Sequence, residues 1–386
     1  MKANKLHIIA DDKIPFLKGV LEPYANIRYL KGSDINSHDV KDADALIVRT
    51  RTKCDKTLLS GSAVKFIATA TIGFDHIDTD YCRKNNIKWT NAPGCNSSSV
   101  EQYITSVLLN MAADNLINPE NSTIGIVGVG NVGSKIVRIA KALGMNVLLN
   151  DPPRKRKEKD DSFVDLEKIQ KEADIISFHT PLNKEGIDKT FHLVNELFFR
   201  NLKKTPWVFN TSRGAVVEQK ALLAAIKSKL VRGAVLDVWE SEPELNTETL
   251  SLVQYASPHI AGYSTDGKAN GTSMSVNALF KFFGIEAEEW YPVNIPMAGT
   301  KNIILDCHSM NKWEILRQVY NQTYNILIDH NELISKPSSF ENLRGNYRIR
   351  REPQNYTVKL INNPYDEIDT ILRKLNFQVL EQDCFC

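Results

Sequence analysis

Short apolar segments alternate with helix-forming or turn-forming stretches along most of this 386-residue chain. Each segment is rich in β-branched or aromatic residues, which predicts a strand. Strands that alternate with helices favour a parallel sheet covered by helices on both faces, so the sequence predicts an α/β fold. The expected strands form two blocks: 6–11, 26–30, 45–50, 64–70 and 87–92, then 122–128, 145–151, 173–180, 206–212, 232–239 and 253–260.

The alternation is interrupted at two places. Pro93 and Gly94 end the first block, and apolar residues at helical spacing between Val100 and Met111 predict a long connecting helix. After about residue 285, strands are expected at 301–307, 355–361 and 377–381, with an amphipathic helix at 363–376. This last stretch predicts a small, separate α+β unit.

A glycine turn opens the second block. The segment "IGIVGVGNVGSKI" carries Gly128, Gly130 and Gly133 between an expected strand and an expected helix at 134–143. In a dinucleotide-binding turn, the first glycine allows a tight bend, the second lets a pyrophosphate approach, and the third lets the helix pack on the strand. The next strand ends in Asp151, where a carboxylate accepts hydrogen bonds from ribose hydroxyls and repels a 2′-phosphate. These positions predict NAD as the cofactor, with NADP left open by the nearby Arg154.

Composition excludes several classes of protein. With 42% hydrophobic and 24% charged residues the chain is typical of a globular protein, and its net charge of +2 gives no general attraction to nucleic acid or an anionic membrane. No stretch approaches the roughly 18 apolar residues of a membrane span. Six cysteines occur without a paired CxxC framework, so we expect no metal site, reduced thiols and a cytoplasmic protein.

Three kinds of polar side chain lie near the ends of strands of the second block. Arg213 comes just after one strand, Asp237 lies near the end of the next with Glu242 in the following loop, and His259 lies near the end of the last. Ligands bind at this edge of open α/β sheets. An arginine can hold a carboxylate, a histidine can remove a hydroxyl proton, and a neighbouring acid favours the charged imidazole. Together they predict hydride chemistry on a 2-hydroxy acid, whereas each alone could be a surface ion pair, a solvated acid or a structural histidine.

The motifs "VGVGNVG", "FHTPL", "NTSRGAVV", "LDVWESEPE" and "SPHIAGYS", in this order, resemble those of the D-2-hydroxyacid dehydrogenase family. The resemblance implies a Rossmann-type NAD domain inserted into a flavodoxin-like substrate domain. It also covers "HIAGYSTDGKANGT" and "LRGNYRIRRE", which are similar to a branch with an added C-terminal α+β dimerisation domain. The domains expected on this basis are 1–94 and 257–285 for substrate, 95–256 for NAD and 286–386 for a homodimer interface.

The same resemblance assigns roles to individual residues. It implies Arg213, Glu242 and His259 as the catalytic set, and Thr50, Thr71 and Tyr263, with Arg213, as substrate contacts. To NAD it assigns Gly128, Gly130, Asn131, Val132, Gly133, Asp151, Thr180, Thr211, Ser212, Asp237 and Gly262. The substrate implied is a small phosphorylated 2-hydroxy acid, with a phosphoglycerate dehydrogenase as the alternative enzyme and an NAD-sensing scaffold as the alternative of another class.

A phosphorylated substrate needs a second cationic group besides Arg213. Arg49, Arg51 and Lys53 alternate along an expected strand and its loop, which would direct them to one side. Arg344, Arg348 and Arg351 would share a face if their segment were helical. Either set could instead form surface or inter-subunit ion pairs.

Overall fold

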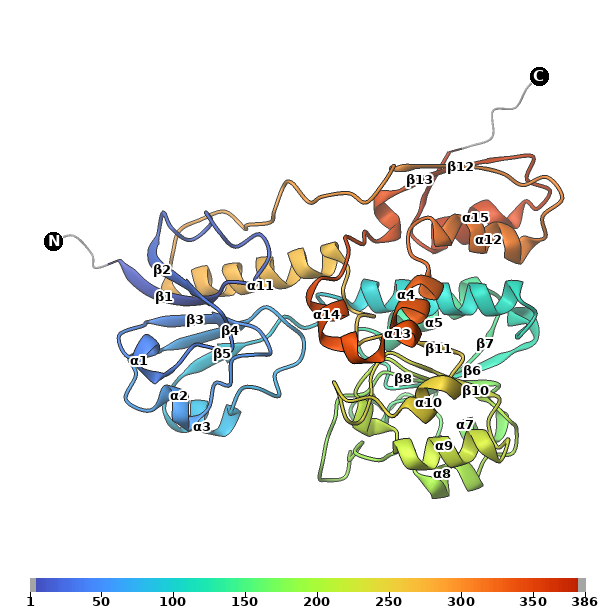
Figure 1. Cartoon of the computed structure of the whole chain (residues 1–386), viewed down its shortest axis with the longest axis horizontal. Coiled ribbons are helices and arrows are strands. Elements are labelled where there is room, and N and C mark those ends of the chain that lie inside the picture. Colours follow the sequence, from blue (N-terminus) through green and yellow to red (C-terminus); the bar gives the residue numbers. More distant parts are fainter. Residues whose placement is uncertain (1–4, 381–386) are drawn as a thin grey trace. The chain divides into compact units, whose positions relative to one another are not determined.

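The computed structural model describes residues 5–380, which form two compact units (Figure 1). The first unit contains the chain up to Asn96 together with Ser264–Pro296. The second contains Ser97–Tyr263 and the chain from Met297 onward. Each unit is therefore built from two stretches that are far apart in the sequence.

The first unit is a five-stranded parallel sheet with the order β2-β1-β3-β4-β5. This is the order of flavodoxin-like folds. Apolar side chains are buried on both faces of the sheet, and Val276, Leu279 and Phe280 of the returning helix contribute to one of these cores. The strands are β1 (Leu6–Asp11), β2 (Ala25–Leu30), β3 (Ala45–Val48), β4 (Phe66–Thr69) and β5 (Lys88–Thr90), and the helices are α1 (Ser37–Val40), α2 (Lys56–Leu59), α3 (Thr79–Lys84) and α11 (Thr265–Phe283).

The second unit contains a six-stranded parallel sheet with the order β11-β10-β9-β8-β6-β7. Phe163 adds a single bridge to Leu149 beyond β7, which marks where a further edge strand would lie. With that position counted, the order is the one of dinucleotide-binding folds, and it reverses at β6. The strands are β6 (Thr123–Val127), β7 (Asn146–Asn150), β8 (Ile175–Phe178), β9 (Trp207–Asn210), β10 (Gly233–Leu236) and β11 (Tyr255–Ala256).

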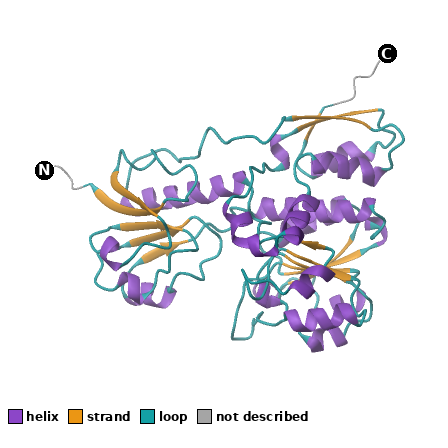
Figure 2. Ribbon diagram, viewed as in Figure 1, coloured by secondary structure: helices purple, strands orange, loops and turns teal. Residues whose placement is uncertain are grey.

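Helices cover both faces of this sheet (Figure 2). Successive strand residues alternate between the two cores, as Ile126 and Val127 of β6 do, because side chains of a strand point to opposite faces. The helices are α4 (Ser97–Ala113), α5 (Gly133–Ala142), α6 (Pro152–Glu158), α7 (Leu166–Glu172), α8 (Glu196–Arg200), α9 (Gln219–Lys227) and α10 (Thr247–Leu252).

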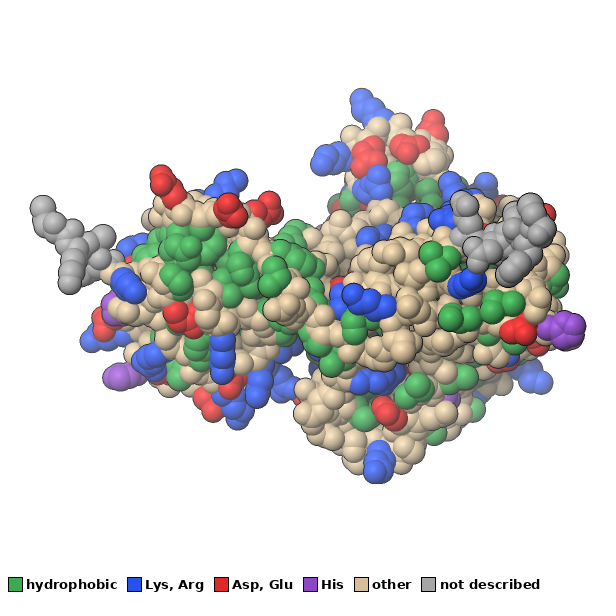
Figure 3. Space-filling view, turned by 90° about the horizontal axis from the view of Figure 1, so that it is seen from above, with side chains coloured by type: hydrophobic (Ala, Val, Ile, Leu, Met, Phe, Trp, Pro, Cys, Tyr) green, Lys and Arg blue, Asp and Glu red, His purple; other side chains and the backbone are tan. Residues whose placement is uncertain are grey.

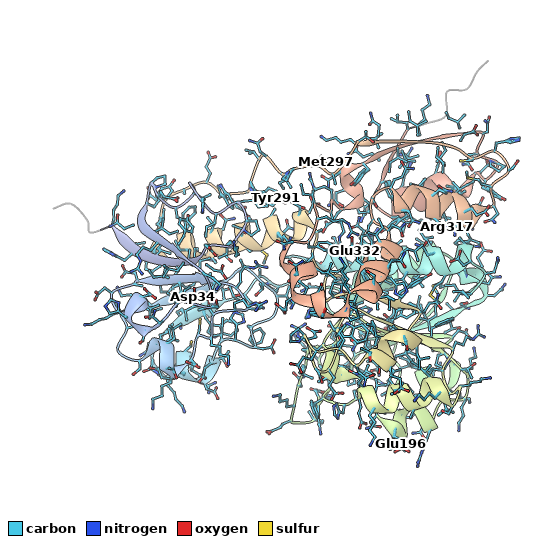
Figure 4. The ribbon with its side chains drawn as sticks, viewed as in Figure 1. Asp34, Glu196, Tyr291, Met297, Arg317 and Glu332 are labelled. Carbon is cyan, nitrogen blue, oxygen red and sulfur yellow. The ribbon has the colours of Figure 1, made fainter. Side chains whose placement is uncertain are left out.

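The C-terminal segment forms a small three-stranded parallel sheet with four helices. It begins at Met297 and carries Arg317 on α12 and Glu332 on α13 (Figure 4). The helices α12, α13 and α14 were not expected from the sequence. The elements are β12 (Asn302–Asp306), α12 (Lys312–Asn321), α13 (Ile326–Ser335), α14 (Phe340–Gly345), β13 (Thr357–Ile361), α15 (Glu367–Lys374) and β14 (Gln378–Val379).

This segment shares its core with the six-stranded sheet instead of forming an independent unit. The helix α4 packs against α5, α12 and α13, and Gln102 of α4 donates a buried hydrogen bond of 2.9 Å to the carbonyl of Arg351. The chain passes between units at Asn96–Ser97, Tyr263–Ser264 and Pro296–Met297. The domain roles and the boundaries expected from the sequence, at 94, 256 and 285, stay a prediction.

Three further features concern the surface, the helices and the residue types that bind metals. On the face seen in Figure 3, acidic and basic side chains are interspersed. Among residues 5–380, none of the helices is both long and apolar enough to pass through a membrane. In the same part of the chain, no cluster of His, Cys, Asp or Glu is arranged to hold a metal ion. Cys384 and Cys386 lie outside the described residues.

Candidate active site

The glycine turn joins β6 to α5 with little space to spare. Gly128 has φ +87°, and a Cβ added there would lie 2.7 Å from the carbonyl oxygen of His179. A Cβ at Gly133 would collide with the carbonyl oxygen of Gly128, whereas one at Gly130 would meet no atom within 4 Å. The turn is thus packed on the protein side and open at its second glycine, as the approach of a pyrophosphate requires.

Asp151 lies directly against this turn. Its Oδ2 accepts a 2.8 Å hydrogen bond from the amide of Val129, and its Oδ1 accepts one of 3.0 Å from the amide of Arg154 at the start of α6. The Arg154 side chain donates two 2.8 Å hydrogen bonds to Glu158. A guanidinium paired in this way is less available for a 2′-phosphate, which favours NAD over NADP.

Thr180 lies across the turn, because β8 is the neighbour of β6 where the strand order reverses. A Cβ at Gly128 would be 3.0 Å from the methyl group of Thr180. The hydroxyl of Thr180 is buried and has no hydrogen-bond partner in the protein. Such an orphaned polar atom is costly unless a ligand satisfies it, so the residues around the turn fit a bound dinucleotide.

The histidine next to Thr180 is structural. Burial lowers the pKa of His179 to about 3, so the ring is neutral. Its Nε2 lies 2.9 Å from the Ser177 hydroxyl and its Nδ1 lies 3.4 Å from the hydroxyl of Thr211. The adjacent Ser212 donates from both its amide and its hydroxyl to Asn210. Thr211 and Ser212 therefore follow β9 in a loop that is bonded back to the strand end.

His259 and Glu242 form a close pair beyond β11 and β10. The Nδ1 of His259 lies 2.7 Å from Oε2 of Glu242, and Oε1 of Glu242 accepts a 2.8 Å hydrogen bond from the amide of Trp239. Burial raises the pKa of the Glu242 carboxyl, but the hydrogen bond and charge of His259 outweigh it, and the pKa is lowered overall. Glu242 is thus ionised, holds Nδ1, and leaves Nε2 of the imidazole for a reacting hydroxyl.

Asp237 holds the turn that carries His259. Its carboxylate is 1% exposed and accepts hydrogen bonds from the Ser257 hydroxyl at 2.6 Å and from the amides of Ile260 at 2.7 Å and Ala261 at 2.9 Å. Burial raises the pKa of Asp237, against the effects of His259 and of these bonds. Both carboxylate oxygens of Asp237 thus accept hydrogen bonds inside the protein. The expected contact between Asp237 and NAD stays a prediction.

Arg350 binds the other side of the same turn. This role was not expected from the sequence. Its guanidinium donates to the carbonyls of Ala261 at 2.6 Å and Ile260 at 3.4 Å, and it stacks over the ring of Tyr324. The side chain is almost fully buried. The peptides after His259 are therefore held at their N–H groups by Asp237 and at their carbonyls by Arg350. A basic run in "YRIRRE" was the available signal.

Arg213 lies in a loop that packs on the Glu242 loop. It precedes a short 3₁₀ turn, and a Cβ at Gly214 would collide with the backbone carbonyl of Trp239. The Nη1 of Arg213 donates to the carbonyl of Ser212 at 2.9 Å. The loops bearing Arg213 and Glu242 are thus neighbours at the carboxyl edge of one sheet.

The residues expected to contact substrate are divided between the two units. Thr50 and Thr71 follow the paired strands β3 and β4 of the first unit. The hydroxyl of Thr71 lies 2.8 Å from that of Thr69 and donates to the carbonyl of Gly73. In the second unit, Tyr263 follows the His259 turn and Gly262, and its hydroxyl accepts a 3.2 Å hydrogen bond from Arg344.

The strand alternation expected for Arg49, Arg51 and Lys53 is wrong, and the condition for a shared helical face of the other three arginines is not met. The strand β3 ends at Val48, so the residues from Arg49 to Lys53 lie in a turn and do not alternate along a strand. The helix α14 ends at Gly345, so Arg344, Arg348 and Arg351 do not share a helical face. Arg344 contacts Tyr263, Arg348 pairs with Asp329, and Arg351 donates to Asn355. The local sequence pattern did not reveal where β3 and α14 end, because tertiary packing sets the ends of such elements.

Known proteins of one family resemble this chain over most of its length. Residues 101–261 match the model of the D-isomer specific 2-hydroxyacid dehydrogenase NAD-binding domain. The chain is 51% identical to erythronate-4-phosphate dehydrogenase of Bacteroides thetaiotaomicron, over 92% of this chain and 99% of that protein. It is 40% identical to the enzyme of that name from Porphyromonas gingivalis, over 92% and 95%.

Solved structures match a shorter part of the chain. The D-lactate dehydrogenase of Aquifex aeolicus, complexed with NAD and lactic acid, is 27% identical with a TM-score of 0.60, over 72% of this chain and 95% of that one. The NAD-bound 3-phosphoglycerate dehydrogenase of Entamoeba histolytica is 23% identical with a TM-score of 0.61, over 75% and 99%, and supports the fold. These two dehydrogenases align over nearly their whole length, yet they leave about a quarter of this chain unmatched. The segment from Met297 onward makes up a similar share of the chain.

Proposed function

This chain belongs to the erythronate-4-phosphate dehydrogenase branch of the D-isomer specific 2-hydroxyacid dehydrogenase family, and on that premise we propose that it oxidises 4-phospho-D-erythronate. The product is (R)-3-hydroxy-2-oxo-4-phosphooxybutanoate, and the reaction serves pyridoxal 5′-phosphate biosynthesis. The observation that carries the proposal is the 2.7 Å contact of His259 with Glu242, at the edge of the sheet that bears the glycine turn.

The protein groups divide the chemistry among them. Arg213 binds the substrate carboxylate through its forked N–H groups. Nε2 of His259 takes the proton of the substrate hydroxyl, and Glu242 stabilises the imidazolium that results. NAD, when bound, supplies the acceptor for the hydride that leaves the same carbon. Asp237 and Arg350 keep His259 in place, while Thr50, Thr71 and Tyr263 are proposed to contact the substrate.

Backbone and side chains around the glycine turn are proposed to hold NAD. The amides from Gly130 to Gly133, at the N-terminus of α5, would hold its phosphates. Asp151 would accept hydrogen bonds from its ribose, and Thr180 would supply a hydroxyl that has no partner in the protein. Thr211, Ser212, Asp237 and Gly262 complete the proposed set on the nicotinamide side.

Substrate preference tests this function. Purified protein should form NADH with 4-phospho-D-erythronate at a kcat/KM at least ~10-fold above that with 3-phospho-D-glycerate, because a site built for one carbon skeleton discriminates by at least this factor. A 2-oxo acid is included in parallel assays to reoxidise any NADH that stays bound. Preference for the three-carbon acid would contradict the proposal and indicate a phosphoglycerate dehydrogenase. Absence of turnover with both, despite NAD binding, would favour the NAD-sensing scaffold.

We also propose that the protein is a cytoplasmic homodimer assembled through its C-terminal segment. Among the described cysteines, Cys54, Cys82 and Cys307 are buried, free thiols, in keeping with a reducing compartment. In the small sheet, Ile303 points into the core while Ile304 on β12 is 64% exposed and Ile361 on β13 is 41% exposed. These two exposed apolar side chains on one face of the sheet support the proposal that a partner packs there.

Replacing Ile304 with glutamate is expected to convert a dimer into a monomer, because it buries a charge in the proposed interface. Sedimentation velocity measures the change. The control is Ile187→Glu, which alters a side chain that is 87% exposed in a loop of the nucleotide-binding part. A dimer that survives Ile304→Glu, or a wild-type monomer, would refute this interface.

A further inference from the structure

Arg344 stands beside the candidate reaction centre although it belongs to the C-terminal segment. It lies near the end of α14, and its Nη2 donates a 3.2 Å hydrogen bond to the hydroxyl of Tyr263. Its guanidinium lies over the rings of Tyr263 and Phe340, with 5.7 Å and 5.8 Å to their centroids. Tyr263 directly follows the turn that Asp237 and Arg350 hold, so Arg344 lies next to the turn that carries His259.

The charge of Arg344 also interacts with the carboxylate of Glu242, the acid that pairs with His259. Burial disfavours the charged guanidinium, but Tyr263, Glu242 and Glu341 outweigh this effect and raise the pKa of Arg344. In turn, Arg344 is one of the groups that oppose the effect of burial and lower the pKa of Glu242. Arg344 is therefore a permanent positive charge within reach of the site.

Few strong contacts within the protein neutralise the charge of Arg344. The Nη1 of Arg344 is 3.5 Å from Glu341, at the limit of a hydrogen bond, and its Nε is buried without a partner. By contrast, Arg348 on the same segment pairs at 2.5 Å with Asp329, a buried carboxylate. The side chain of Arg344 remains 20% exposed, and a guanidinium has five N–H donors. It has both the charge and the donors to bind an anionic group.

We propose that Arg344 binds the phosphate of the substrate, with Tyr263 aligning its guanidinium. This inference rests on the proposed function, since it concerns the phosphorylated end of the same substrate, and it leaves Arg213 for the carboxylate. A planar guanidinium binds phosphate through paired N–H donors. On this proposal, the C-terminal segment adds phosphate specificity to the dehydrogenase fold. One solved structure of that fold is a D-lactate dehydrogenase, and lactic acid carries no phosphate.

The test compares two substrates that differ only in the phosphate, 4-phospho-D-erythronate and D-erythronate. Arg344→Gln should lower kcat/KM for the phosphorylated substrate by about 10- to 100-fold, mainly through KM, because a hydrogen-bonded charge contact is lost. With D-erythronate the change should stay within about 3-fold. Arg344→Lys keeps the charge without the fork and should give an intermediate loss. Lys336→Gln removes an exposed charge from the same segment and is the matched control.

Each contrary outcome has a distinct meaning. Equal losses with both substrates would overturn the inference and make Arg344 a residue that positions Tyr263 and Glu242. A loss confined to the phosphorylated substrate in Arg51→Gln, and absent in Arg344→Gln, would place the phosphate at the turn after β3 instead. Should Arg344→Gln fail to fold, Arg344→Lys decides alone by the same comparison. A wild type that uses both substrates equally well would refute the proposed function itself, and this inference with it.

Discussion

Replacement of His259 by asparagine is expected to lower kcat by at least ~100-fold while leaving NAD affinity unchanged. The imidazole is the proposed proton acceptor, and a positioned acid–base group contributes factors of about 10² to 10⁴. Asparagine can still donate a hydrogen bond to Glu242 through its NH₂ group, so the loop should keep its conformation. Steady-state kinetics with 4-phospho-D-erythronate and fluorescence titration with NADH measure the two effects.

A second histidine–glutamate pair provides the control. His192 lies 2.5 Å from Glu240 in the same unit, with exposure similar to that of the His259–Glu242 pair. His192→Asn removes a comparable pair that has no proposed part in proton transfer, and it should retain turnover within about 3-fold. Near-normal kcat in His259→Asn would show that another group accepts the proton.

Asp237→Asn is expected to lower both stability and turnover. The carboxylate faces the amides of Ile260 and Ala261, so an asparagine must turn its NH₂ group towards a hydrogen-bond donor. An unsatisfied buried donor costs about 1–3 kcal/mol, which should appear in the free energy of unfolding measured with urea. Displacement of His259 by even ~1 Å should lower kcat by about 10- to 100-fold.

The variant Asp329→Asn is the control that separates the loss of stability from the loss of turnover expected for Asp237→Asn. Asp329 is another buried carboxylate of the same unit, and it accepts hydrogen bonds from Tyr324, Tyr347 and Arg348. Its replacement should destabilise the protein with a smaller loss of kcat, because it does not touch the His259 turn. Unchanged kcat in Asp237→Asn would contradict its role in holding His259. A selective loss of NAD affinity would instead support the cofactor contact expected from the sequence.

The cofactor turn was predictable because its determinants are local. Gly128, Gly130 and Gly133 occur within six residues, and the backbone conformation that they permit depends on their own missing side chains. Asp151 ends the next strand, and parallel pairing of β6 with β7 brings that end to the turn. The strand pattern likewise indicated the two larger parallel sheets, although most of their strands are shorter than expected.

The contacts that hold His259, the proposed catalytic histidine, were not predictable in this way. Arg350 reaches the carbonyl of Ala261 across 89 positions of the sequence, and nothing near either residue announces the contact. The three arginines of the C-terminal segment were grouped by helical spacing, but α14 ends before two of them. Each then finds a different partner, which depends on how α13 and α14 pack in the shared core.

The sequence by itself determined the α/β class, the glycine turn with its acid, and the set of Arg213, Glu242 and His259 at strand ends. These follow from side-chain size, backbone freedom and a repeating apolar pattern, which act over a few neighbouring residues. Only the tertiary structure decided that His259 faces Glu242, that Asp237 and Arg350 clamp its turn, and that Arg344 stands beside Tyr263. These contacts join residues distant in sequence, and burial makes them specific because unpaired polar groups in a core are costly.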